Sequence, residues 1–145
     1  MKVLADTSVW SSALRRKQPP QNPFAAELRE LIREMRVQMI GPVRQELLSG
    51  IPSQSQFETL RRRLSEFPDM KISTWDYELA AEYFNICRGK GIQGSNTDFL
   101  ISAISSSHKM PILTTDNDFK MFQKHIPILL HFHRFKNSPG DQSPG

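Results

Sequence analysis

The stretch KVLADTSVW, residues 2–10, sets the structural pattern that the rest of the chain repeats. Residues 2–5 end in an uninterrupted apolar run, which predicts a short buried strand. Residues 6–8, Asp-Thr-Ser, carry side chains that accept hydrogen bonds from the backbone at the start of a helix. Val9 and Trp10 then begin an apolar helical face. The stretch therefore predicts a strand followed directly by a helix.

The same alternation of short apolar strands and amphipathic helices continues along the chain. Further strands are expected at residues 37–40, 70–73, 112–114 and 128–131. Further helices are expected around residues 28–35, 41–48, 57–67, 75–88, 96–107 and 119–124. This alternation is typical of α/β proteins, in which helices flank a central parallel sheet, here of four or five strands. In such folds functional sites lie beyond the carboxyl ends of the strands.

The composition narrows the class of protein. A chain of 145 residues fits one domain, which we place at residues 1–136, and residues 137–145 are expected to be a disordered tail. No apolar run approaches the roughly 18 residues of a membrane span. The N-terminus lacks the roughly 7–15 apolar residues of a secretion signal, so a cytoplasmic location is expected. The single cysteine, Cys87, rules out an internal disulfide, and the net charge of +4 is compatible with a polyanionic partner.

Five acidic residues fall where expected strands end or in the helices that connect them. Asp6 follows the first expected strand, and Glu46 lies in the helix after the second. Asp98 lies in the helix before the fourth strand, and Asp116 and Asp118 follow that strand. Right-handed crossovers bring the carboxyl ends of parallel strands to one edge of a sheet. We therefore expect these acids to converge.

Each acid also has a purely structural explanation when it is taken alone. Asp6 can cap a helix, and Asp98 can close a capping box with the serine three residues before it. Asp116 and Asp118 are ordinary turn residues, and an exposed helix face accounts for Glu46. The functional interpretation therefore depends on the set of acids rather than on any one of them.

Convergence of these acids would favour a bound cation. Two unit charges 4 Å apart repel by about 4 kcal/mol at an effective dielectric constant of 20. Oxygen ligands without a cluster of cysteine or histidine favour magnesium or manganese over zinc. Such ions bind phosphate oxygens and activate water. The predicted chemistry is hydrolysis of a phosphodiester.

Four sequence motifs occur in the order, and in the strand or helix context, of one known family. They are DTSVW at residues 6–10, ELLSG at 46–50, TDFLISA at 97–103 and TTDNDF at 114–119. Together they resemble the PIN-domain family. The length of the chain and the segment CRGKGI at residues 87–92 are most similar to the VapC-type ribonuclease toxins of toxin–antitoxin pairs. The resemblance extends from residue 1 to about residue 134.

The resemblance implies a three-layer PIN-like fold and a metal-dependent endoribonuclease with a site of four acids. By this likeness the catalytic residues are Asp6, Glu46, Asp98 and Asp116. The direct ligands of Mg²⁺ or Mn²⁺ would be Asp6, Asp98 and Asp116. Glu46 would hold a second ion or a metal-bound water. The auxiliary residues would be Asp118, Thr114 and Thr7, with Thr114 placed to orient a carboxylate or a water molecule.

The resemblance also implies three partners: an RNA substrate, a cognate antitoxin protein and a second copy of the chain in a homodimer. Two apolar helix stripes could leave a groove for an antitoxin segment. One comprises Leu28, Leu31, Ile32 and Met35, and the other comprises Phe57, Leu60, Leu64 and Phe67. Basic clusters at residues 15–17, 61–63, 88–90 and 120–124 are candidates for RNA contact, although most such clusters are solvated faces.

Three other interpretations stay open on the sequence alone. A PIN domain that binds RNA without cutting it would keep the same motifs. A receiver-like signalling module also sets acids around magnesium, but it needs paired acids after the first strand, where Asp6 stands alone. His131 and His133 would face the same side of a strand, but a zinc site needs further ligands that the sequence does not supply.

Overall fold

The computed structural model describes residues 1–14 and 22–135. The elements, in chain order, are β1 (Val3–Ala5), α1 (Thr7–Leu14), α2 (Pro23–Arg33), β2 (Val37–Gln38), α3 (Gly41–Leu48), α4 (Gln54–Leu64), α5 (Thr74–Gly89), α6 (Asn96–His108), β3 (Ile112–Leu113) and α7 (Asp118–Gln123). The predicted tail at residues 137–145 and the basic cluster at residues 15–17 lie outside the described residues. Among the described helices, none is both long enough and apolar enough to cross a membrane.

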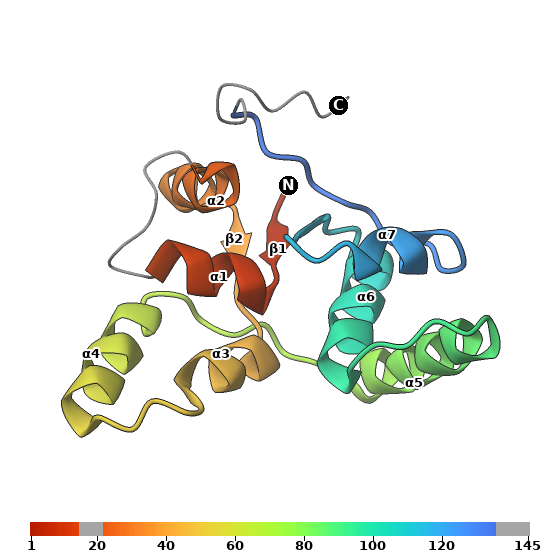
Figure 1. The fold of residues 1–145 in the computed structure, drawn as a ribbon, viewed down its shortest axis with the longest axis horizontal. Coiled ribbons are helices and arrows are strands. Elements are labelled where there is room, and N and C mark those ends of the chain that lie inside the picture. Colours follow the sequence, from red (N-terminus) through yellow and green to blue (C-terminus); the bar gives the residue numbers. More distant parts are fainter. Residues whose placement is uncertain (15–21, 136–145) are drawn as a thin grey trace.

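A parallel sheet with strand order β2-β1-β3 forms the centre of the fold. β1 is fully buried, because its residues are apolar and it pairs with a neighbour on each side. In the register of β1 with β3, Ala5 lies opposite Leu113. Figure 1 shows α1 and α2 on one side of the sheet and α5, α6 and α7 on the other. The carboxyl ends of β1 and β3 therefore lie next to each other, as the α/β prediction requires.

The predicted four or five strands exceed the three that form the sheet in the described residues. Residues 70–73 and 128–131 were expected as strands, but the first segment is preceded by an isolated bridge at Asp69 and the second contains only one, at Leu130. The first region cannot extend its pairing, because Ser73 already caps α5. The second is limited by its neighbour β3, which is only 2 residues long. Both regions still run parallel to the sheet where they touch it.

Local sequence signals set the starts of the helices. Asn22 caps α2, where its side chain accepts hydrogen bonds from two backbone N–H groups and Pro23 is the first helical residue. Ser73 and Ser95 begin α5 and α6 with capping boxes, in which an aspartate three residues later returns the hydrogen bond. The helix that carries Asp98 is thus fixed at its first turn.

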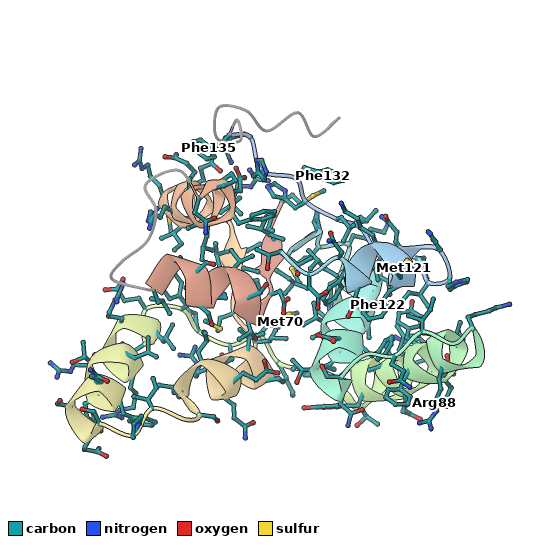
Figure 2. All side chains as sticks on the ribbon, in the orientation of Figure 1. Met70, Arg88, Met121, Phe122, Phe132 and Phe135 are labelled. Atoms are coloured by element: carbon teal, nitrogen blue, oxygen red, sulfur yellow. The ribbon has the colours of Figure 1, made fainter. Side chains whose placement is uncertain are left out.

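An aromatic cluster joins α6 to α7. Phe122 of α7 (Figure 2) is fully buried, and its ring centroid lies 4.7 Å from that of Phe99 and 5.2 Å from that of Phe119. Gly94, in the loop before α6, passes so close that an added Cβ would lie 2.7 Å from Phe122 Cζ. Only a residue without a side chain fits at this point without moving the rings.

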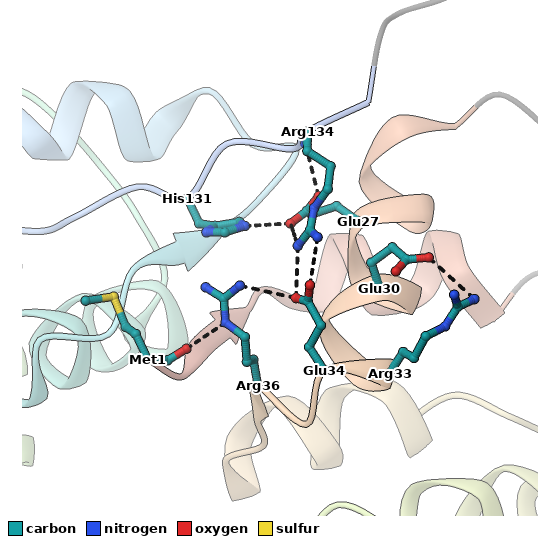
Figure 3. Close-up of polar contacts among 8 residues, drawn as sticks. All are labelled: Met1, Glu27, Glu30, Arg33, Glu34, Arg36, His131 and Arg134. Atoms are coloured by element: carbon teal, nitrogen blue, oxygen red, sulfur yellow. Dashed lines mark hydrogen bonds and ion pairs between the residues drawn. The ribbon is translucent and has the colours of Figure 1, made fainter.

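A buried charge cluster ties the C-terminal segment to α2 (Figure 3). Glu27 of α2 is 1% exposed, and its carboxylate lies 2.7 Å from His131 Nε2 and 3.0 Å from Arg134 Nε. Arg134 also contacts Glu34 at 2.8 Å. The ring of His133 packs edge-on against an aromatic ring of α2. Both histidines therefore lie against α2, and His131 is hydrogen-bonded to a buried acid.

Candidate active site

Asp6 lies at the point where β1 ends and α1 begins. Its backbone N–H donates to the carbonyl oxygen of Leu113 in the neighbouring strand at 2.9 Å, and the residue is only 7% exposed. Its Oδ1 accepts a hydrogen bond from the N–H of Thr7 at 2.8 Å. Its Oδ2 accepts from the hydroxyls of Ser8 at 3.2 Å and Thr114 at 2.8 Å. The carboxylate is therefore held firmly at the edge of the sheet.

Thr114, just beyond β3, connects Asp6 to Asp116. Its hydroxyl donates to Asp6 and accepts a hydrogen bond from the backbone N–H of Asp116 at 3.0 Å. Asp116 Oδ1 in turn accepts from the N–H of Asp118 at 2.8 Å, where α7 begins. One hydroxyl thus fixes two acids from different strands relative to each other.

Asp98 reaches the site from the first turn of α6. Its Oδ2 accepts a hydrogen bond from the N–H of Ser95 at 3.0 Å, and the hydroxyl of Ser95 accepts from the N–H of Asp98 at 3.0 Å. The structural explanation of Asp98 as the acid of a capping box is therefore confirmed. Burial raises the pKa of Asp98, and the negative charges of Asp116 and Glu46 raise it further, which together outweigh the hydrogen bonds from Ser95.

The structure brings the four predicted acids into one electrostatic neighbourhood. Burial raises the pKa of Asp6, and the charge of Asp98 raises it further, although its hydrogen bonds oppose the shift. Asp98 is therefore within electrostatic range of Asp6, Asp116 and Glu46, which come from the end of β1, the turn after β3 and α3. In the part of the chain that the structure describes, none of these four acids forms an ion pair with lysine, arginine or histidine.

The three residues predicted as auxiliary differ in how they meet the acids. Thr114 bridges two of them, as described above. Thr7 donates its backbone N–H to Asp6, while its buried hydroxyl has no hydrogen-bond partner among the residues that the structure describes. Asp118 contributes its backbone N–H to Asp116, and its exposed carboxylate lies in the first turn of α7, where the helix dipole favours negative charge.

Ser8 is a site residue to which the sequence reasoning gave no role beyond starting a helix. Its hydroxyl donates to Asp6 and accepts a weak hydrogen bond from the N–H of Thr115 at 3.4 Å. The available signal was its position two residues after an acid, where serine hydroxyls commonly return to a preceding carboxylate.

The donor set of this site suits a divalent cation by chemistry. The carboxylates are hard oxygen ligands, the pKa values of Asp6 and Asp98 are raised in part by neighbouring acids, and no described basic side chain forms an ion pair with any of the four acids. The unpartnered hydroxyl of Thr7 is a further oxygen next to Asp6. Within residues 1–14 and 22–135, however, no three acid, histidine or cysteine side chains stand in a geometry that could hold a metal ion. The residues fit magnesium or manganese in the type of their ligand atoms, and not in the arrangement that the described side chains adopt.

Comparison with known proteins identifies similar chains. The PIN domain family matches residues 3–124. Over 127 residues the chain is 29% identical to ribonuclease VapC11 of Mycobacterium tuberculosis and to VapC ribonuclease Mb1587 of Mycobacterium bovis, alignments that cover 84% of this chain and 92% of each relative.

Two solved structures share the fold. The crystal structure of FitAcB from Neisseria gonorrhoeae superposes with a TM-score of 0.70 at 19% identity, covering 89% of this chain and 96% of that one. The structure of VapBC2 from Rickettsia felis, bound to a DNA fragment from their promoter, superposes with a TM-score of 0.72 at 20% identity, covering 90% and 98%. The predicted PIN-like fold is confirmed.

Proposed function

Since this chain belongs to the PIN domain family, we propose that it is a magnesium- or manganese-dependent endoribonuclease that hydrolyses RNA phosphodiester bonds. The observation that carries the proposal is the position of Asp98, whose pKa is raised by burial and by the charges of Asp116 and Glu46. Asp98 in turn raises the pKa of Asp6. Such a group of mutually repelling carboxylates is stable in the ionised form when a cation joins it. The names of the VapC relatives add support for RNA as the substrate.

The proposal assigns a role to each acid. The metal ligands are Asp6, Asp98 and Asp116, and Glu46 holds a second ion or a metal-bound water. A bound divalent cation lowers the pKa of a water molecule and neutralises negative charge that develops on the phosphate. The hydroxyl of Thr114 is hydrogen-bonded to both Asp6 and the backbone of Asp116 and so fixes their relative position. Ser95 holds one oxygen of Asp98, so that the other oxygen faces no protein donor among the described residues.

We further propose that the chain is the toxin of a type II toxin–antitoxin pair, acts in the cytoplasm, forms a homodimer and is silenced by a cognate antitoxin. Support comes from the VapC relatives and from the structural likeness to VapBC2 and FitAcB. A groove of about 540 Å³ between α1, α3 and α4, lined in part by Leu14, Leu47 and Leu60, can accept the apolar face of an amphipathic helix.

This groove differs from the two-stripe groove expected from the sequence. Leu28, Leu31 and Leu64 are buried in the core, so they offer no surface to a partner. Of the predicted stripe residues, Leu60 alone lines the groove, and residues of α1 and α3 complete it. Periodicity identified the apolar faces but not which of them the rest of the fold covers.

The proposal is tested by incubating the purified chain with a panel of structured RNAs in Mg²⁺ or Mn²⁺, with and without chelator. Asp98→Asn is the test variant, because asparagine can still accept the hydrogen bond from Ser95 and so preserve the cap. Cleavage that requires both metal and Asp98 is the expected result. Equal cleavage by the variant would indicate a contaminating ribonuclease.

The alternative function is a PIN domain that binds RNA without cutting it. It becomes the better account if the folded chain binds both RNA and Mn²⁺, the metal raising its melting temperature, but leaves every RNA intact. The receiver-like alternative has no support in the comparisons, because the matched family is the PIN domain.

A further inference from the structure

A pocket of about 420 Å³ opens beside the acids, between the N-terminus of α3, the middle of α5 and the first turn of α6. Its volume lies within the range of about 300–1,000 Å³ that is usual for small-molecule sites. Most of its surface is apolar, from Tyr77 and Phe84 of α5 and Phe99 of α6, while Asn85 and Asn96 add two carboxamides. A flat aromatic ligand with polar edges matches this lining.

The pocket shares two helices with the acids, and its lining contains none of the four acids. On α6, Asn96 and Thr97 line the pocket and immediately precede Asp98. On α3, Pro42 lines the pocket one helical turn before Glu46, and residues four apart lie on the same helix face. A polymer whose phosphate meets the acids therefore has a neighbouring unit within reach of the pocket.

The aromatic side chains provide surfaces for stacking. Tyr77 is 54% exposed, and Phe84 is half-buried, with its ring held edge-on at 5.4 Å from that of Phe99. Bases of single-stranded RNA stack on such side chains, and any base can do so because every base has a π-face. Phe84 is anchored by the core, so that its free face keeps one orientation.

The carboxamides provide the polar contacts that a base requires. Asn85 and Asn96 are exposed, and their side chains form no hydrogen bond with the described residues, so both carboxamides keep their donors and acceptors for a ligand. A carboxamide matches the N6 donor and the N7 acceptor of adenine. The lining contains no charged side chain, which agrees with an uncharged base rather than with an acidic metabolite.

A positive charge stands on the far side of the same aromatic pair. A second pocket, of about 280 Å³, shares Phe84 and Phe99 with the first and is lined by Arg88 and Gln93. Arg88 projects from the last turn of α5 (Figure 2) and forms no ion pair with any described residue. The acids, the base-sized pocket and a free guanidinium thus lie in sequence along α6 and α5.

We propose that this pocket binds one base of the RNA strand beside the cleaved phosphate, with adenine favoured, and that Arg88 contacts the next phosphate along the strand. The base stacks on Phe84 and Tyr77, and its edge is read by Asn85 and Asn96. The assignment rests on the proposed ribonuclease function, and it makes α5 the element that determines sequence preference.

The first test compares cleavage sites of a randomised RNA library for the wild-type chain, Asn85→Ala and Glu82→Ala. Glu82 is exposed on α5 but lines neither pocket, so Glu82→Ala is the matched control. The wild-type chain and the control should favour adenine at one fixed position next to the cut. Asn85→Ala should lose at least about fivefold of that preference and raise KM, with kcat within about threefold. An unchanged preference in Asn85→Ala would overturn the subsite.

The second test does not depend on cleavage. AMP, CMP, GMP and UMP are added to the wild-type chain in the presence of chelator, and the aromatic resonances of Tyr77 and Phe84 are followed by NMR. AMP should shift them most, and Asn85→Ala should abolish the shift. If RNA is cleaved but no nucleotide perturbs these rings, the subsite is wrong and the nuclease function stands. If AMP binds but no RNA is cleaved, the pocket stands and the nuclease function fails.

A second copy of the chain could also cover the pocket. If the chain self-associates, both rings are buried in the contact and AMP does not bind, the pocket belongs to that contact and the proposal is overturned.

Discussion

Thr114 and Asp6 are 108 positions apart in the sequence and are joined by a 2.8 Å hydrogen bond from the threonine hydroxyl to the aspartate Oδ2. The same hydroxyl accepts the backbone N–H of Asp116. One uncharged side chain therefore sets the relative position of two acids that come from neighbouring strands. Changing it tests the geometry of the site without removing a carboxylate.

Replacing Thr114 with valine keeps the shape of the side chain and removes the hydroxyl. We expect Thr114→Val to cleave RNA about 10–100-fold more slowly, because partners that orient metal ligands typically have effects of this size. The free energy of unfolding should fall by about 1–2 kcal/mol, since Asp6 and the amide of Asp116 each lose a partner. Thr114→Ser restores the hydroxyl and should recover most of the activity. Wild-type cleavage by the valine variant would show that the bridge has no part in the reaction.

Two capping boxes provide a matched pair of variants. Ser73→Ala and Ser95→Ala each remove a capping hydroxyl from the start of a helix, and each should lower the free energy of unfolding by about 1 kcal/mol. Of these two serines, only Ser95 is hydrogen-bonded to a candidate metal ligand, Asp98. Ser95→Ala should therefore reduce cleavage and Ser73→Ala should not, as measured in parallel with urea unfolding. Equal losses of cleavage would mean that Ser95 acts through stability alone.

The lowered pKa of Glu27 makes the free energy of unfolding depend on pH. Burial raises the pKa of Glu27, but hydrogen bonds from Arg134 and His131 outweigh this effect and lower the pKa to about 2. A lowered pKa in the folded state contributes stability above the ordinary pKa of 4.5, and this stability is lost as the pH falls from there toward 2. The full contribution is about 3 kcal/mol at neutral pH. Urea unfolding of Glu27→Gln should show that loss at pH 7 and a smaller one near pH 3.

Glu30 on the same helix supplies the control for this measurement. It pairs with Arg33 at 3.4 Å across one turn, at the surface. Glu30→Gln should change the free energy of unfolding by less than about 0.5 kcal/mol, because surface ion pairs contribute little to stability. If the two variants behave alike, the cluster of Figure 3 is not the source of the acid sensitivity.

Gly94 and Gly89 test the packing between α6 and α7. An added Cβ at Gly94 would lie 2.7 Å from Phe122 and 2.9 Å from Phe99, whereas one at Gly89 meets nothing within 4 Å. Gly94→Ala should destabilise the chain by about 1–3 kcal/mol, because both rings are buried and must shift. Gly89→Ala should be neutral or slightly stabilising. Thermal unfolding of the two variants distinguishes overpacking from a general effect of alanine.

The positions of the acids could be predicted from the sequence because local signals carry them. Asp6 and Asp116 follow apolar runs that form parallel strands, and the topology of such sheets places those strand ends together. Asp98 was foreseen both as a capping acid and as a ligand, and the first of these roles is confirmed. The catalytic roles themselves stay predictions until cleavage is measured.

Other features left no local signal. Glu27 lies in an amphipathic helix, and its partner Arg134 is 107 positions away. The sequence around either residue therefore does not predict that the two pair. The extent of strand pairing at residues 128–131 depends on the length of β3. That length is set elsewhere in the chain, so it cannot be inferred from residues 128–131 alone. Long-range contacts of this kind decide where a short apolar run becomes a strand and where it forms a single bridge.

The strand order β2-β1-β3 also governs when the site can exist during synthesis. β1 leaves the ribosome before both of its neighbours in the sheet, and β3 follows it by more than 100 residues. A nascent chain that has emerged only as far as α6 carries Asp6 but neither Thr114 nor Asp116. A protein that cuts RNA, as proposed, is therefore unable to act on the message that encodes it until the segment that carries Thr114 and Asp116 has been synthesised.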